Sequence, residues 1–178
     1  MTIGMPRIDR LPAQERGLTV GDFLVPIRIS ERLHTRARHL ALILIGTALI
    51  VLCARVSFYV GGNPVPFTGQ TFGVLLTAGA LGFRRGVASM LLYLALGIAG
   101  FAVFADQKHG LDVVLGATGG YLIGFVVASA IVGRLAELGW DRTILGAIGA
   151  MLIGSVVIYA IGVPWLAYVV WALAGSRS

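Results

Sequence analysis

Long apolar segments with few charges, separated by short polar connections, constrain this chain most strongly. About 20 apolar residues in a helix cross a hydrocarbon core of about 30 Å. Only 12% of the residues are charged, against about 25% in soluble domains, and the mean hydropathy is +0.90. We therefore predict an all-α, polytopic membrane helix bundle. The expected crossings are 37–60, 70–83, 86–104, 118–132 and 143–162.

Two of the apolar segments are too short to cross a bilayer unaided. The segment 70–83 rises only about 21 Å as a helix and must be shielded by protein. Residues 164–174 are apolar but cannot span alone. The predicted architecture is therefore five spans plus a short C-terminal stub, with the C-terminus outside.

Arginines indicate how the chain is oriented in the lipid bilayer. Seven precede the first apolar segment, and four more fall in connections expected on the same side: Arg84, Arg85, Arg134 and Arg142. Positive charge accumulates on the cytoplasmic side of membrane proteins. We therefore predict a multi-pass protein of the cell membrane, with 1–36 as a cytoplasmic Arg-rich tail and 37–178 as the transmembrane domain. The net charge of +6 reflects topology and does not indicate a nucleic-acid partner.

The sequence offers little support for catalysis. No His/Glu pair falls on one helix face within a predicted span, which argues against a metal site. A phosphate-cradling loop of Walker type is also absent from the sequence. The single cysteine, Cys53, excludes an internal disulfide. We expect no catalytic residues, no metal and no cofactor.

A proline-containing loop, residues 63–71 (NPVPFTGQT), is the strongest candidate for a ligand-binding element. Pro64 and Pro66 make the connection stiff and non-helical. Irregular backbone in a membrane protein lies at the surface or lines a cavity. With Asn63, Thr68 and Gln70 as polar groups, the loop is predicted to be a gate over a small-molecule site.

Other candidates carry two interpretations each. Arg55, near the outer end of the first span, either reaches the headgroups or balances an anionic ligand. The glycine-rich start of the fourth span, 116–125, either attracts a carboxylate through free amides or is simply a tight helix start. Tyr93 and Tyr121 offer rings and hydroxyls, yet tyrosine is common at membrane interfaces.

Small residues recur at four-residue spacing in the last two spans. The two stripes are Gly120, Gly124 and Ala128, and Gly146, Ala150 and Gly154. Such stripes allow helices to approach closely. Internal packing is the favoured interpretation, and docking of a partner is the alternative. Ala37 and Ala41 form a weaker pair in the first span.

Four segments in order resemble the BioY family, the biotin-binding S components of energy-coupling-factor (ECF) transporters. The segments are 62–76 (GNPVPFTGQTFGVLL), 80–93 (ALGFRRGVASMLLY), 97–105 (GIAGFAVFA) and 116–125 (GATGGYLIGF). The resemblance covers roughly residues 40 to 168.

The resemblance implies a six-helix bundle that binds biotin near the outer face. It assigns Thr68 and Gln70 to the gate, and Tyr93, Gly119, Gly120 and Tyr121 to the lining or shaping of the pocket. The implied partners are a membrane T component and two ATPases. The small-residue face of the first helix, with Ala37 and Ala41, would meet the T component.

The chain departs from the family pattern in several places. Ala102 and Ala117 stand where prolines are usual, and Arg55 stands where a neutral polar residue is commoner. The sequence given lacks the family's sixth helix, whose Pro-Gly-Asp motif and following Lys are expected to contact biotin. Arg55 taking over the biotin carboxylate is one hypothesis. The sequence therefore predicts a biotin uptake subunit. The alternative is a non-transporting or truncated BioY-like protein that acts only as a helix-packing partner, and a homo-oligomer stays open.

Overall fold

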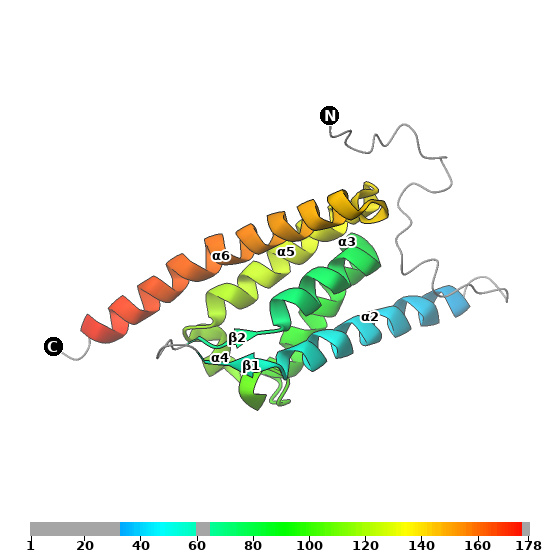
Figure 1. The fold of residues 1–178 in the computed structure, drawn as a ribbon. Coiled ribbons are helices and arrows are strands. Elements are labelled where there is room, and N and C mark those ends of the chain that lie inside the picture. Colours follow the sequence, from blue (N-terminus) through cyan, green and yellow to red (C-terminus); the bar gives the residue numbers. More distant parts are fainter. Residues whose placement is uncertain (1–32, 60–64, 176–178) are drawn as a thin grey trace, which may run out of the picture.

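A computed structural model describes residues 33–59 and 65–175, with side chains for 36–59 and 65–172 (Figure 1). The long helices are α2 (Leu33–Ala54), α3 (Gln70–Ile98), α5 (Gly119–Glu137) and α6 (Ile144–Gly175). Short elements connect them: β1 (Ser57–Phe58), β2 (Phe67–Thr68), η3 (Ala105–Gln107), α4 (Leu111–Leu115) and η4 (Trp140–Arg142). All four long helices are long and apolar enough to cross a membrane.

Helix α3 is a hairpin of two arms that reverses at Gly82. That residue has φ 78° and ψ −177°, a backbone region that is open essentially to glycine alone. Gln70 on the first arm bonds to Tyr93 on the second. A Cβ added at Gly86 would lie 2.9 Å from the Cα of Ala78. The arms are therefore antiparallel and side by side, and they correspond to the predicted spans 70–83 and 86–104.

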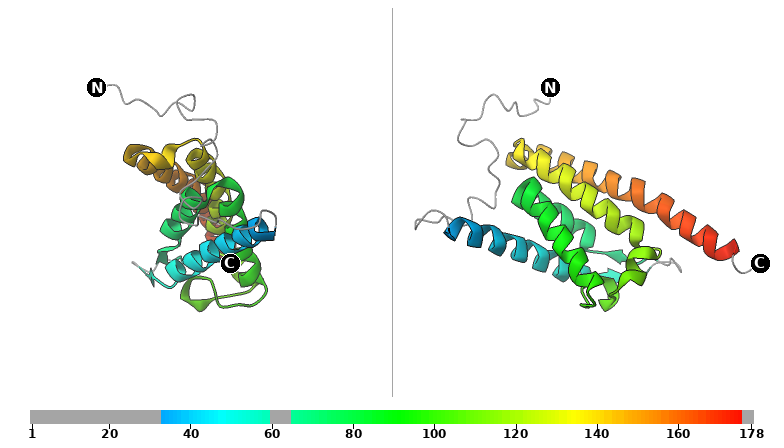
Figure 2. Two further views of the ribbon diagram at one scale, coloured as in Figure 1. Left: turned by 90° about the vertical axis from the view of Figure 1, so that its right-hand side faces the viewer. Right: turned by 180° about the vertical axis from the view of Figure 1, so that it is seen from behind.

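The helices pack in the order α2, α3, α5, α6, so that the short arms of α3 lie between longer helices. Figure 2 shows α2 and α6 on opposite sides of this elongated bundle. Glycines make the close contacts, as predicted. A Cβ at Gly120 would lie 2.2 Å from Trp165, and one at Gly124 would lie 3.0 Å from the carbonyl oxygen of Ile158. The stripe on α5 is therefore used for internal packing against α6.

The segment expected as a separate C-terminal stub continues α6 instead. The helix runs through Pro164 without a break and is 32 residues long. A proline inside a helix removes one backbone hydrogen bond. The next residue, Trp165, joins the helix to the start of α5 by donating from Nε1 to the carbonyl oxygen of Gly116, 2.9 Å away. Beyond this contact the helix extends past the rest of the bundle (Figure 1), with Tyr168 and Trp171 exposed.

Within residues 33–59 and 65–175, a two-stranded antiparallel sheet is added to the predicted all-α fold. Ser57 pairs with Thr68, and Phe58 pairs with Phe67. The Phe58 and Phe67 rings stack with their centroids 5.9 Å apart. This pair of strands occupies the connection between α2 and α3, where the proline-containing loop was expected to be non-helical.

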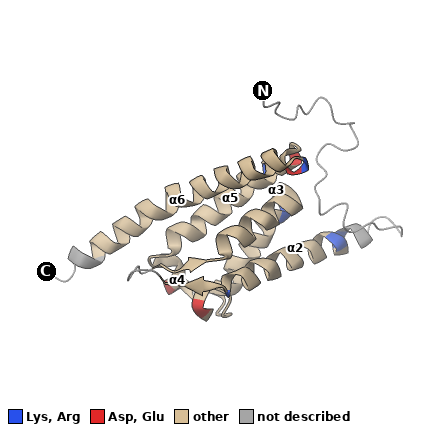
Figure 3. Cartoon of the chain, in the orientation of Figure 1, with Lys and Arg blue, Asp and Glu red and all other residues tan. Residues whose placement is uncertain are grey.

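Charged residues gather at the two ends of the bundle (Figure 3). At one end α2 begins, α3 reverses, α5 ends and α6 begins. We name it the arginine end after Arg36, Arg38, Arg84, Arg85, Arg134 and Arg142. At the opposite end lie β1, β2, η3 and α4. We name this the cavity end, for the reason given next.

Candidate functional site

A cavity of ≈110 Å³ opens at the cavity end, between β2, α3, α5 and α6. None of its described lining residues is charged, and hydroxyl, phenol and amide groups alternate with apolar side chains. The lining consists of Val65, Pro66, Phe67, Thr68, Gln70, Thr71, Ala105, Thr118, Tyr121, Leu122, Phe125 and Tyr159. Such a lining suits a small, neutral polar group with an apolar body.

Gln70 is held by a chain of hydrogen bonds at the start of α3. Thr68 donates from Oγ1 to Gln70 Oε1 over 3.1 Å, and the amide of Gln70 donates from Nε2 to the Tyr93 hydroxyl. Tyr93 in turn donates to the carbonyl oxygen of Val103, 3.2 Å away. Gln70 is 6% exposed and Tyr93 is fully buried. Tyr93 therefore positions Gln70 from behind rather than lining the cavity.

A glycine at the junction between β2 and α3, Gly69, allows this arrangement because it has no side chain. The backbone N–H of Gly69 donates to the carbonyl oxygen of Val56 over 2.9 Å. A Cβ at Gly69 would lie 2.7 Å from the carbonyl oxygen of Cys53. Glycine thus lets β2 pass directly across the last turn of α2, which brings Thr68 and Gln70 to the cavity.

The start of α5 supplies the opposite wall. Tyr121 lines the cavity and packs edge-on against Tyr159 of α6, with centroids 6.1 Å apart. Gly119 and Gly120 are buried, and an added Cβ at Gly119 would lie 1.9 Å from the carbonyl oxygen of Val114. These glycines set the position of α5, and with it the position of Tyr121.

The amides at this helix start are largely used within the turn. Gly119 donates to the carbonyl oxygen of Gly116, and both Tyr121 and Leu122 donate to that of Thr118. Of the two interpretations of this segment, the geometry favours a tightly built helix start over a carboxylate site.

Arg55 lies outside the cavity lining. Its side chain is exposed and donates from Nη2 to the carbonyl oxygen of Ala102 over 3.0 Å. The contact joins the end of α2 to the connection between α3 and α4. Asn63 and Pro64 of the predicted gate fall outside the described residues. Ala37 and Ala41 are exposed on α2, away from the cavity.

Several lining residues were not predicted individually from the sequence. Thr71 directly follows Gln70, and Thr118 lies three residues before Tyr121, so both could have been proposed from position alone. Tyr159 could not, because nothing in its surroundings distinguishes it from an ordinary packing residue of an apolar helix. Among the described residues there is no cluster of three His, Cys, Asp or Glu side chains that could hold a metal.

A model of the BioY family matches residues 28–176. The chain belongs to the BioY family. The biotin transporter BioY of Thermotoga maritima is 41% identical over 117 residues, which cover 66% of this chain and 67% of that protein. The probable biotin transporter BioY of Pyrococcus horikoshii is 38% identical over 135 residues, which cover 76% of this chain and 78% of that protein.

A solved structure shares the fold of this BioY family member. It is the S-component for biotin from an ECF-type ABC transporter, matched with a TM-score of 0.71 and 25% identity over 78% of this chain and 76% of that chain. The resemblance inferred from four segments is thereby confirmed. The chain is a multi-pass membrane protein of the BioY family.

Proposed function

We propose that this BioY family member is a biotin-binding subunit that captures biotin at the cavity end. The observation that supports the proposal most strongly is the uncharged lining of the cavity, whose polar groups include the hydroxyls of Thr68, Thr118 and Tyr121 and the amide of Gln70. The ureido ring of biotin has two N–H donors and one carbonyl acceptor. Neutral amides and hydroxyls match that pattern without the cost of burying a charge.

Each predicted residue has a role in the proposal. Thr68, Gln70 and Tyr121 contact the ligand, and Tyr93 fixes the amide of Gln70. Gly119 and Gly120 shape the wall. The valerate carboxylate has no cation among the described lining residues, so it points out of the cavity. Arg55 is the candidate counter-ion there.

The charge division supports an orientation. Arginines at the cytoplasmic surface follow the positive-inside rule, which puts the arginine end and the N-terminus inside the cell. The cavity end then faces outward, where biotin enters. An S component needs a T component and ATPases for uptake, and the exposed Ala37–Ala41 face of α2 is the proposed contact with the T component. Small exposed residues allow the close helix approach that such a contact requires.

Calorimetry with biotin on the purified 178-residue chain tests the binding function. We expect saturable binding with one site, and competition by close biotin analogues but not by unrelated vitamins. Absence of saturable binding would favour the alternative of a helix-packing partner without transport. Displacement by a different vitamin would instead reassign the substrate.

A matched pair of ligands tests Arg55. If Arg55 balances the carboxylate, Arg55→Ala weakens biotin about tenfold or more, as for loss of a charge-assisted bond, and leaves biotinamide unchanged. If Arg55 only braces the loop through Ala102, both ligands weaken alike and by less.

A further inference from the structure

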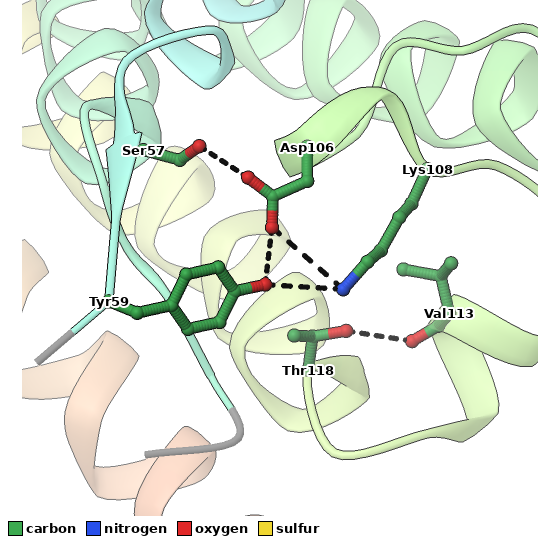
Figure 4. A network of polar contacts seen from close by, with 6 residues as sticks. All are labelled: Ser57, Tyr59, Asp106, Lys108, Val113 and Thr118. Carbon is green, nitrogen blue, oxygen red and sulfur yellow. Dashed lines mark hydrogen bonds and ion pairs between the residues drawn. The ribbon is translucent and has the colours of Figure 1, made fainter. Parts of the chain in front are cut away.

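A polar cluster beside the cavity joins β1 to the turn that follows α3 (Figure 4). The Asp106 carboxylate is at its centre. Ser57 donates from Oγ to Oδ1 over 2.6 Å, and the Tyr59 hydroxyl donates to Oδ2. Lys108 Nζ lies 3.9 Å from Oδ2 and donates to the Tyr59 hydroxyl over 3.3 Å. Residues about 50 positions apart in the chain are thus held by one side chain.

The two hydroxyl contacts outweigh the ion pair in this cluster. The Lys108 side chain is 54% exposed, and exposed ion pairs contribute little because water and salt screen them. Hydrogen bonds to an ionised carboxylate are stronger than neutral ones. The hydrogen bond from Ser57, followed by that from Tyr59, holds the pKa of Asp106 below its usual value of 3.8. The carboxylate is therefore ionised and accepting at neutral pH.

The backbone is bent to present this carboxylate. Asp106 and Gln107 both adopt left-handed conformations, with φ of 56° and 59°. Non-glycine residues rarely do so, and two in succession are costly. Aspartate tolerates this region better than most residues. The turn is thus maintained by its contacts: two backbone hydrogen bonds between Phe104, Ala105 and Lys108, and the two side-chain hydrogen bonds from Ser57 and Tyr59 to Asp106.

Both partners of the cluster belong to walls of the cavity. β1 is paired with β2, whose Phe67 and Thr68 line the cavity. Ala105, directly before Asp106, lines it from the other side. The cluster therefore connects two walls of the cavity, and a ligand that leaves between them has to break it.

We propose that Asp106 is a positioning residue, a clasp that fastens the β1–β2 pair to the turn after α3 and so limits the rate at which ligand leaves the cavity. This inference rests on the proposed biotin-binding function for its ligand, but not for its geometry. Ser57 and Tyr59 are the two donors that close the clasp, and Lys108 contributes the smaller electrostatic part.

The decisive variant is Asp106→Gly, with Gln107→Gly as its matched control. Both introduce glycine at a positive φ in the same turn, and Gln107→Gly relieves at least as much backbone strain, because aspartate tolerates this region better than glutamine. Only the first removes the carboxylate. We expect Asp106→Gly to raise the biotin dissociation rate about tenfold, as for loss of charge-assisted hydrogen bonds. Gln107→Gly should stay within about twofold, because that side chain has no part in the clasp. Ser57→Ala and Tyr59→Phe should each give part of the effect.

A second measurement separates failure of the clasp from failure of the proposed function. Backbone amide hydrogen exchange of residues 57–58 and 67–69, measured without biotin, should speed up in Asp106→Gly and not in Gln107→Gly. Equal exchange and equal dissociation in the two variants would overturn the proposal. If the unaltered chain does not bind biotin, the proposed function fails, and exchange alone still decides whether Asp106 fastens the strands.

Discussion

The arginine end joins its helices through short connections that turn at glycines, one of them containing η4, whereas the cavity end joins them through longer connections with strands and side-chain hydrogen bonds. Gly82 turns α3 back on itself, and Gly139, with φ 88°, follows α5. At the cavity end the connections 55–69 and 99–118 contain β1, β2, η3 and α4. Short reversals leave little freedom, while longer connections held by side chains can open.

The contrast extends to how each end is fastened. At the arginine end the Glu137 side chain accepts from the backbone N–H of Phe83 and from Arg134, each over 3.0 Å. This caps the second arm of α3. At the cavity end the corresponding carboxylate, Asp106, accepts from side chains of a strand pair. One carboxylate secures a helix end, and the other secures a wall of the cavity. Variants at the two ends should therefore affect stability and binding differently.

The largest expected effect is at the helix crossing of the arginine end. A Cβ at Gly133 would lie 2.7 Å from backbone atoms of Gly82 and Phe83. Gly133→Val should therefore lower the free energy of unfolding by about 3 kcal/mol, as for overpacking of a core. Thermal unfolding in detergent measures this. Gly79→Ala is the control, because its nearest neighbour would be Val132 at 4.0 Å. Equal midpoints for the two variants would contradict the crossing described here.

The next effect belongs to the cavity end. Gln70→Leu removes the amide that bonds to Thr68 and Tyr93. We expect biotin affinity to fall about 10- to 100-fold, since a polar ligand group and a buried hydroxyl both lose their partner. Calorimetry checks the affinity, and a thermal scan checks that the bundle persists. An affinity close to that of the unaltered chain would remove Gln70 from the site.

Glu137→Gln should show the reverse pattern, at a smaller magnitude. The neutral amide weakens the contacts to Phe83 and Arg134, and we expect a loss of about 1 kcal/mol in unfolding free energy. Biotin affinity should be unchanged within error, because Glu137 is the last residue of α5, at the arginine end, and the cavity is at the opposite end of the bundle. A clear change in affinity at constant stability would show that the two ends are coupled.

The smallest effect concerns pH. A carboxyl group with a lowered pKa contributes stability above its unfolded pKa and loses it as pH falls through the folded value. The pKa of Asp106 lies below 3.8 because Ser57 and then Tyr59 donate to it. Biotin dissociation should therefore be independent of this group from about pH 5 to pH 8. Stopped-flow displacement across that range tests the prediction. A transition near neutrality that Asp106→Gly abolishes would refute it.

Much of the fold was predictable because a bilayer leaves a chain few choices. The apolar segments predicted the helices, and the stripe from Gly120 to Ala128 predicted a packing face that the structure uses. The reversal at Gly82 was expected only as a connection, because a glycine in an apolar run does not reveal its φ. The continuity of α6 was not predicted, because a proline such as Pro164 more often ends or kinks a helix than lies inside an unbroken one.

The site was predictable only in part. Thr68, Gln70 and Tyr121 line the cavity. They could be proposed from the sequence because each lies in or next to a short polar or glycine-rich segment of an otherwise apolar chain. Tyr93 is predicted to line or shape the pocket, and its place behind Gln70 depends on the pairing of two helix arms. Asp106 was not predicted to be a functional residue. Its contacts join residues 57–59 to a distant turn, and such pairings cannot be obtained from local spacing.

The length of α6 has a consequence for how the protein responds to its lipid. Its 32 residues rise about 48 Å, whereas a hydrocarbon core measures about 30 Å. A helix longer than the membrane tilts, or projects beyond it. Trp165 of this helix donates to Gly116, and Tyr159 on the same helix forms part of the cavity wall. A change in the tilt of α6 would move Tyr159 with it, so we expect the shape of the cavity to respond to membrane thickness.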